Sequence, residues 1–458
     1  MKNFLKKLLQ LSAPLRILSF VFIFLFAVSC EKDYFPVPPP PKVPKNTPTL
    51  EASYNTEVPT ALNDKFWKDA DFHEVLASDL NTGQLYGDGF LNMTGLFAGK
   101  TGFNAGADPE IVLKAAYDDT KLYILAEWVD SDFNPAKYAS LFDGPSDPLK
   151  TPESNADWTS QGNSDKIAFA FEIEAASSAA GTFSAVGCAA SCHNGVKQPL
   201  SGKVDIWNWD LATSAPLGYA HDMLVTSDLG ITMDAGQSMA VRNKADTADS
   251  RSKPAFEWDG VAHSVTHPDG KVSNLDPAFY MLNKTAFLGD PAIGKVRYAN
   301  SNCGYCHGYN GEGGTNAAFN VPGFNRKHSR ETIKTFATNN DHPGKTYYDP
   351  IPLADREHLI AFIIGISGVP GHYLQTPTAS NADVWAISNV PLPRVNTLDP
   401  HTKYQVLLVR NLTTNNADDV QFTAPQGKEF VFGLALTDND GKNHIGSPKE
   451  ILTFLNKE

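Results

Sequence analysis

The sequence predicts a mainly β protein, an antiparallel β-sandwich that is split by an inserted all-α segment. Apolar and polar side chains alternate in residues 111–117, 122–128 and 167–173, which is typical of strands with one buried face. The same character returns in 404–412 and 429–438, after a long stretch of helical character. We therefore expect the late strands to complete the sheets that begin near residue 110.

The first thirty residues predict a processing segment that lies outside the fold. Four positive charges accompany an apolar run at 17–28, and the small residue Ser29 stands directly before Cys30. The apolar run is too short to span a membrane. It resembles a lipoprotein signal peptide, which implies removal of residues 1–29, acylation of the Cys30 thiol and a membrane anchor made of lipid. A chance cysteine at this position is the alternative.

A proline-rich linker follows this cysteine, and the mature chain is acidic. The linker, residues 30–58, holds seven prolines, which is typical of an extended polyproline II spacer. Loss of the signal removes four positive charges and changes the formal net charge from −13 to −17. Such a surface argues against nucleic acid and anionic lipid as partners and favours a basic or neutral redox protein.

The remaining chain divides by pattern into a split β domain and an insertion. We expect residues 59–283 and 373–458 to form the two parts of the sandwich, and residues 284–372 to form the insertion. Within the insertion, a short helix precedes residue 303, a second helix begins after Ser329 as its N-cap, and a third spans 353–366. This is the three-helix plan of a small cytochrome.

The insertion carries the sequence CGYCH at residues 303–307. Two cysteines one helical turn apart can form thioether bonds to the two vinyl groups of one haem, and a histidine directly after them can bind the iron. Cys303 and Cys306 are therefore expected to attach haem c, with His307 as proximal ligand. A zinc or redox CxxC site is the alternative, but zinc would need two further ligands at sensible spacing.

The residues around this motif resemble class I cytochromes c. The resemblance covers about 85 residues and rests on a glycine and an aromatic residue before the motif, a glycine-containing loop after it, and a Pro-Gly pair expected to support the proximal histidine: Gly294, Tyr298, Gly311, Glu312, Gly313, Pro322 and Gly323.

That family usually supplies a methionine as the second iron ligand, yet all six methionines of this chain lie at or before Met281. His342 is the expected substitute, followed by His328. His358 is disfavoured because it lies inside the last helix. A His342 ligand would lower the reduction potential relative to methionine. An exposed His342 and an open or water-bound iron form the alternative.

A second motif, CAASCH at residues 188–193, has the same form with one more spacer residue. Its surroundings resemble the haem-binding family of the ethylbenzene dehydrogenase γ-subunit, in particular the members with CxxxCH. The matching segments, on both sides of the insertion, are FWKDA from Phe66, LYILAEWVDSD from Leu122, DKIAFAFEI from Asp165, GCAASCHNG from Gly187, VDIWNWDLATSAPLGYAHD from Val204, VLLVRNL from Val406 and VFGLALTDNDGKNH from Val431. The resemblance implies a β-sandwich with haem c on Cys188 and Cys192, His193 as proximal ligand, and electron transfer rather than catalysis. A small-residue core segment is the alternative.

The second axial ligand of this haem is left open by the sequence. Where the family pattern has a histidine in DIWHW, this chain has Asn208, which is a poor haem ligand. The candidates are His221, then Met223, then His444; Met93 is chemically acceptable because b-haem relatives use methionine and lysine.

The sequence thus predicts a membrane-anchored dihaem c-type cytochrome, located outside the cytoplasm in the periplasm or on the outer-membrane surface. It is expected to carry single electrons between redox partner proteins. The alternative from another class is a haem enzyme or small-ligand sensor with one five-coordinate iron. A third interpretation, a carbohydrate-binding sandwich, would use Trp128, Trp207 and Trp209, although a buried core is their more usual place.

Overall fold

A computed structural model describes most of the chain beyond the proline-rich linker. The described residues are 43–75, 111–130, 134–142, 158–175, 183, 202–225, 231–245, 253–261, 263–309, 311, 313, 328–389, 402–437 and 444–457. The chain divides into two compact units, Met1–Val43 and Pro44–Glu458, and all the elements below lie in the second.

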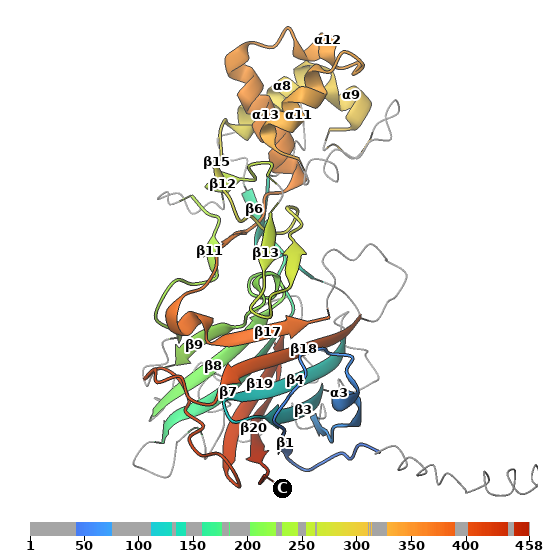
Figure 1. Cartoon of the computed structure of the whole chain (residues 1–458). Helices are drawn as coiled ribbons and strands as arrows, with labels where there is room; N and C mark the ends of the chain where they lie inside the picture. Colours follow the sequence, from blue (N-terminus) through green and yellow to red (C-terminus); the bar gives the residue numbers. More distant parts are fainter. Residues whose placement is uncertain are drawn as a thin grey trace, which may run out of the picture. The chain divides into compact units, whose positions relative to one another are not determined.

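The largest element of the fold is a twelve-stranded sheet (Figure 1). The strand order is β10-β9-β8-β7-β19-β20-β1-β3-β4-β18-β17, with β2 paired to β3. The bounds are β1 Leu50–Tyr54, β2 His73–Val75, β3 Ile111–Tyr117, β4 Lys121–Asp130, β7 Lys166–Ala175, β8 Gly202–Asp210, β9 His221–Val225, β10 Ile231–Met233, β17 Val384–Ser388, β18 Thr402–Asn411, β19 Glu429–Thr437 and β20 His444–Phe454.

The expectation that late strands complete the early sheets is confirmed. Strand β18 pairs with β4 along its whole length, from Thr402 opposite Asp130 to Asn411 opposite Lys121. Strand β19 pairs with β7, from Phe432 opposite Phe171 to Thr437 opposite Lys166. Segments more than 200 residues apart in the sequence therefore lie side by side.

The expectation of a purely antiparallel sheet needs correction, because the sheet is mixed. Strand β1 runs parallel to both of its neighbours, β20 and β3. Neither neighbour is joined to β1 by a hairpin: β3 begins 57 residues after Tyr54, and β20 ends the described chain. Parallel pairing requires such long connections, and no periodicity within β1 itself could have revealed its direction.

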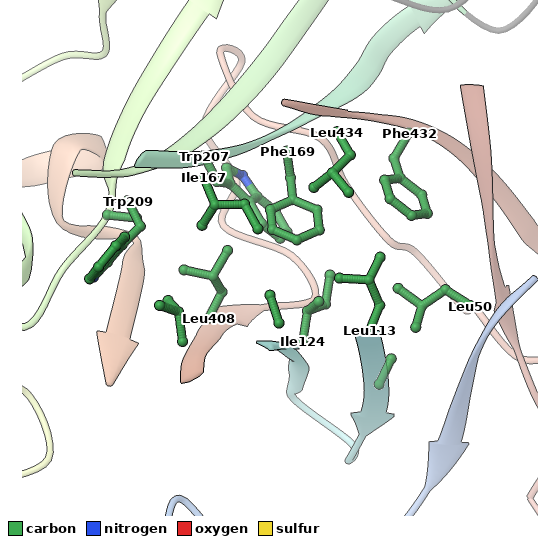
Figure 2. Packing of buried hydrophobic residues seen from close by; sticks show 14 of the residues in the cluster. Leu50, Leu113, Ile124, Ile167, Phe169, Trp207, Trp209, Leu408, Phe432 and Leu434 are labelled. Atoms are coloured by element: carbon green, nitrogen blue, oxygen red, sulfur yellow. The ribbon is translucent and has the colours of Figure 1, made fainter. Parts of the chain in front are cut away.

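The two halves of the sheet face one another across a common core (Figure 2). Trp128 of β4 stacks on Tyr404 of β18 at 4.8 Å between ring centroids, and its other contact is with Trp209 of β8 at 6.0 Å. Strands β4 and β8 are far apart in the strand order, so this contact spans the layer between the halves, as in a sandwich. Trp128, Trp207 and Trp209 are buried in this core and are therefore not available as a sugar-binding surface.

The outward faces of the sheet are also partly covered. Helix α3, Lys65–Asp69, places the buried Trp67 on the outer face of β3, β4 and β18. On the other half, Phe183 packs with Ala170, Val204 and Val225. Phe183 belongs to the connection between β7 and β8, so part of that connection lies against the outward face of these strands.

Short elements connect the sheet to the helices. Four two-stranded sheets are formed by β5 Ala139–Phe142 with β6 Trp158–Gln161, β11 Ala240–Arg242 with β16 His372–Leu374, β12 Phe256–Glu257 with β15 Thr285–Ala286, and β13 Ser264–Thr266 with β14 Val272–Asn274. Two 3-10 helices, η2 Ala215–Leu217 and η3 Ala379–Ala382, complete this set.

The helical segment lies between β15 and β16 in the sequence, as expected for the insertion. Its helices are α8 Pro291–Asn300, α9 Cys303–His307, α11 Arg330–Thr338, α12 Lys345–Tyr348 and α13 Leu353–Ser367, and they group together in Figure 1. The predicted N-cap is confirmed, since the Ser329 hydroxyl accepts from the Thr332 N–H. The predicted domain limits stay predictions. Among the described residues, no helix is both long and apolar enough to cross a membrane.

Candidate haem-binding site

The CGYCH sequence forms the single-turn helix α9, which places both cysteines on one turn. Cys303 and Cys306 are free thiols and each is half-buried. Cys303 packs against the apolar cluster of the helical segment, and burial raises the pKa of its thiol to about 11. Redox-active CxxC pairs have a thiolate of lowered pKa. The environment of Cys303 is therefore the opposite of what the redox CxxC interpretation needs.

The position of α9 depends on a close crossing of helices α8 and α13. A Cβ atom on Gly294 would lie 1.9 Å from the carbonyl oxygen of His358, so only glycine lets the two backbones approach this closely. One turn further along α8, Tyr298 packs on Phe362 of α13 with ring centroids 5.1 Å apart. The Tyr298 hydroxyl donates to the Gly308 carbonyl at 2.9 Å and so holds the residue that directly follows α9. The Gly294 and Tyr298 of the sequence prediction thus both position the motif.

The proximal candidate His307 and the distal candidate His342 lie next to each other. Their imidazole rings are parallel to within 6°, with centroids 6.0 Å apart. His307 ends α9, and His342 lies in the loop between α11 and α12. The structure therefore brings together the two residues that the sequence assigned to the same iron.

The loop that carries His342 is shaped by local hydrogen bonds. The His342 N–H donates to Asn339 at 2.9 Å, and the Gly344 N–H donates to the Nδ1 atom of the imidazole at 3.1 Å. An imidazole that binds iron through Nε2 carries its proton on Nδ1, where it donates. Iron binding at Nε2 is therefore compatible with this loop only if the ring gives up the Gly344 contact.

The other two histidines of the segment have different surroundings. His358, which the sequence disfavoured, accepts a hydrogen bond from the Asp290 N–H at its Nδ1 atom, 2.8 Å away, and so joins α13 to the start of α8. His328 contacts the ring of Phe336 edge-on, with centroids 5.6 Å apart. Among the described histidines, His342 is the one whose ring is stacked on that of His307.

The attachment residues of the second motif, Cys188, Cys192 and His193, lie outside the described residues, as do Cys30 and Met93. The backbone of His444 is described and pairs with Thr437, but its side chain is not.

Of the distal candidates for this second haem, His221 and Met223 are described, both on β9. His221 is buried, its Nε2 atom shares a hydrogen bond of 2.8 Å with the Thr213 hydroxyl, and burial lowers its pKa to about 4. Met223 is half-buried and lies opposite Ile206 of β8. The Nε2 atom of His221 is already engaged, whereas no hydrogen bond joins the Met223 thioether to another described residue.

Strands β7, β8 and β9 present one face away from the sandwich core. The register places Ala168 beside Asn208, Ala170 beside Ile206, and Ile206 beside Met223 on this face. Phe183, five residues before Cys188 in the sequence, packs on the same face. Small side chains and an apolar patch therefore lie next to Phe183 on this face.

A separate group of buried polar residues gives almost no signal in the sequence. The buried Arg410 pairs with Asp205 and Asp419, and Asp222 and Asp234 lie in the same cluster of carboxylates. The one signal in the sequence is an acidic residue at an inward position of a strand, Asp205 in VDIWNWD. The partners come from β9, the segment after β10, and the loop after β18, so no local pattern could have joined them.

Three comparisons with known proteins bear on this site. Residues 64–293 match the family model described as ethylbenzene dehydrogenase. No curated protein matches the chain. Among solved structures, a carbohydrate binding module of family 9 from Caldicellulosiruptor kristjanssonii in complex with glucose aligns with 8% identity, covering 89% of this chain and 96% of that one, at a TM-score of 0.24. A score this low carries no argument about function.

Proposed function

Because the chain belongs to the ethylbenzene dehydrogenase family, which implies a haem-binding redox subunit, we propose that it is a dihaem c-type cytochrome that carries single electrons. The observation that carries the proposal is the parallel pair of His307 and His342 beside the free thiols of α9. The family match, residues 64–293, includes the CAASCH motif but ends before CGYCH. The family therefore supports the haem at CAASCH, and the haem at CGYCH needs support of its own.

For the first haem, Cys303 and Cys306 would hold the porphyrin and His307 the iron. The test of fit is the spacing of the two imidazoles. A metal–imidazole bond of about 2 Å, with about 1 Å more from nitrogen to ring centre, places two rings on opposite sides of one metal roughly 6 Å apart. The 6.0 Å between the centroids of His307 and His342 matches this spacing. The rings are stacked, so His342 would turn its Nε2 edge toward the iron on haem binding, as the loss of the Gly344 contact also requires.

Exposed aromatic side chains in the helical segment give independent support. Among the described residues, four phenylalanine and tyrosine side chains are exposed, and all four lie between residues 305 and 347: Tyr305, Tyr309, Phe336 and Tyr347. Two stand in or directly after α9, and two lie on α11 and α12. A porphyrin is a large apolar group, and packing against it would remove part of this surface from water.

For the second haem, the family membership and the CAASCH motif are the main support. The outward face of β7, β8 and β9 offers a suitable place, because the small, half-buried Ala168 lies beside Asn208 there, whereas Phe183 already covers Ala170. Met223 lies on this face and is our preferred axial ligand. The hydrogen bond between His221 and Thr213 makes His221 second choice, which reverses the order expected from the sequence.

Bound haem iron would supply a one-electron couple, and the protein side chains would determine whether anything else happens there. With His307 and His342 both holding the iron, peroxide or nitric oxide would have no site there. This favours the electron carrier over the alternative, an enzyme or sensor with one five-coordinate iron. The acidic mature surface favours a basic or neutral redox partner.

We further propose that the protein is lipid-anchored outside the cytoplasm. The support is the N-terminal sequence alone, with a short apolar run, Cys30 and the proline-rich linker that follows it. Covalent haem attachment in bacteria takes place after export, so the two features agree. The linker would hold the haem-carrying part away from the bilayer and within reach of partner proteins.

The spectrum of the purified, reduced protein tests the electron-carrier function. Two low-spin haems that do not change with carbon monoxide are expected if both irons have two protein ligands. A high-spin band that shifts with carbon monoxide would contradict the carrier and support the enzyme or sensor. The same spectrum of His342→Ala and of Met223→Leu assigns the response to one haem or the other.

A further inference from the structure

Four aspartates of the described sandwich strands and loops are buried close to one another. Asp205 lies on β8 and Asp222 on β9, whereas Asp234 follows β10 and Asp419 lies in the loop between β18 and β19. Their exposed fractions are 0%, 0%, 5% and 1%, respectively. Burial of this many carboxylates requires compensating positive charge or protons.

Arg410 compensates only part of this charge. Its guanidinium pairs with the Oδ2 atoms of Asp205 at 3.3 Å and Asp419 at 3.1 Å, and it donates to the Val420 carbonyl at 2.8 Å. The Oδ2 atom of Asp205 also accepts from the Val420 N–H at 2.9 Å. One guanidinium therefore faces four buried carboxylates. It pairs with one oxygen of Asp205 and one oxygen of Asp419.

The remaining carboxylate oxygens have no hydrogen-bond donor among the described residues. These buried atoms are Oδ1 of Asp205, both oxygens of Asp222, both oxygens of Asp234 and Oδ1 of Asp419. One oxygen each from Asp205, Asp222 and Asp419 lie within 4.8 Å of one another, and a second group with the same spacing is formed by Asp234, Asp418 and Asp419. Native proteins rarely leave buried polar atoms without a partner.

We propose that Asp205, Asp222 and Asp419 bind a divalent cation of the calcium class, with Asp234 next to it. Calcium takes six to eight oxygen ligands from carboxylates and carbonyls in flexible geometry. Softer transition metals prefer histidine or cysteine ligands, which this cluster lacks. Asn381 adds a neutral oxygen nearby: its Oδ1 atom is buried without a donor, and its amide donates to the Asp234 carbonyl.

The cation would fasten the sandwich to the chain that returns from the helical segment. Segment 378–383, which follows β16 and precedes β17, is already held here, because Asn381 bonds to Asp234 and the Ser380 hydroxyl donates to Asp418 at 3.2 Å. The loop after β18 brings Asp418 and Asp419 to the same place. Removal of the cation is therefore expected to loosen the connection between β16 and β17 as well as strand β9 and its neighbour, the edge strand β10.

Protonation is the alternative way to bury these carboxylates. Burial first, and then the charge of Asp205, raises the pKa of Asp222 well above its ordinary value, and burial raises the pKa of Asp234 to about 8. A protonated cluster would bind no metal and would not respond to calcium or to a chelator. The two alternatives therefore differ in a direct measurement.

Metal analysis of the purified full-length protein tests the proposal. After dialysis against micromolar calcium, one calcium per chain is expected, and a chelator should lower the midpoint of thermal unfolding by about 5 °C, with recovery when calcium returns. Asp222→Asn keeps the shape of the side chain but should bind no calcium and show no chelator effect. Asp341→Asn, at an exposed position, is the control and should behave as the unmodified protein.

Absence of metal together with an unchanged midpoint in calcium and in chelator would overturn the proposal in favour of the protonated cluster. Full calcium binding by Asp222→Asn would overturn the assignment of the site. Zinc or manganese in place of calcium after dialysis against all three would contradict the calcium class. None of these results depends on haem content, because haem is counted separately by its absorbance.

Discussion

Arg330 and Glu257 form a buried bidentate ion pair that joins helix α11 to strand β12. Nε of the guanidinium lies 2.5 Å from Oε1 of Glu257 and an Nη atom lies 2.8 Å from Oε2, while the other Nη atom pairs with Glu357 of α13 at 3.0 Å. The exposed fractions of Arg330 and Glu257 are 6% and 2%. This pair therefore fixes the helical segment to the strand that precedes it in the sequence.

Loss of the guanidinium should be costly, because it leaves Glu257 buried without its partner. Arg330→Met is expected to lower the free energy of unfolding by about 3–5 kcal/mol, measured by urea denaturation. The control Lys334→Met, on the same helix but with a partly exposed ion pair to Glu357, should cost less than about 1 kcal/mol. The double variant Arg330→Met/Glu257→Gln should recover part of the loss, because no unpaired carboxylate is then buried. Equal losses in Arg330→Met and Lys334→Met would contradict a special role for the buried pair.

Substitution of His342 should open one iron to exogenous ligands. His342→Ala is expected to convert one of two haems from low spin to high spin and to make its reduced spectrum respond to carbon monoxide, because no side chain replaces the imidazole. His328→Ala is the matched control from the same segment and should keep both haems low-spin. A carbon monoxide response of His328→Ala but not of His342→Ala would reverse the ligand assignment.

The crossing of α8 and α13 should not tolerate a side chain at Gly294. A Cβ there would lie 1.9 Å from the His358 carbonyl oxygen, so Gly294→Ala must push the helices apart. We expect destabilisation by about 3 kcal/mol or more, against the gain of about 1 kcal/mol that alanine usually brings inside a helix. Urea denaturation measures it, and Lys295→Ala on the same helix controls for helix propensity. A stabilised Gly294→Ala would mean that the helices cross further apart.

Acid should destabilise the fold in part through His372. Burial, and then the charge of Lys137, lower the pKa of this histidine to about 4, although Asp210 opposes the shift. The unfolded chain takes up the proton near pH 6.5, before the folded chain does, so stability is lost as the pH falls from about 6.5 to 4.

The His372→Gln variant isolates this contribution, because the carboxylates titrate equally in both proteins. The loss of unfolding free energy between pH 7 and pH 4 should be smaller in the variant by up to about 3 kcal/mol, from urea denaturation at each pH. Identical losses would show that His372 does not titrate on unfolding in this range.

Much of the fold could be predicted because its signals are local. Alternation in residues 111–117 and 167–173 reports a strand with one buried face, and both segments are strands. Ser329 and the apolar run at 353–366 predicted the limits of two helices to within a residue or two. The direction of β1 could not be predicted, because it depends on which distant strands lie beside it and not on its own five residues.

The candidate sites also combine features that a local sequence pattern predicts with features that only the folded chain shows. The spacing of CGYCH and the lack of a later methionine were enough to pair His307 with His342, and the structure places their rings parallel. The aspartates around Arg410 come from four separate segments, so no spacing in the sequence joins them. The preference for Met223 over His221 required the hydrogen bond to Thr213, which only the folded chain contains.

The number of covalently bound haems per chain tests the central claim most directly. It is obtained from the mass of the secreted, mature protein together with a pyridine haemochrome assay on the same sample. Two haem groups per chain are expected, with one lost in Cys303→Ser/Cys306→Ser and the other lost in Cys188→Ser/Cys192→Ser. A mature chain that carries no haem at either motif would contradict the proposal, and a single haem would limit it to the motif whose substitution removes it.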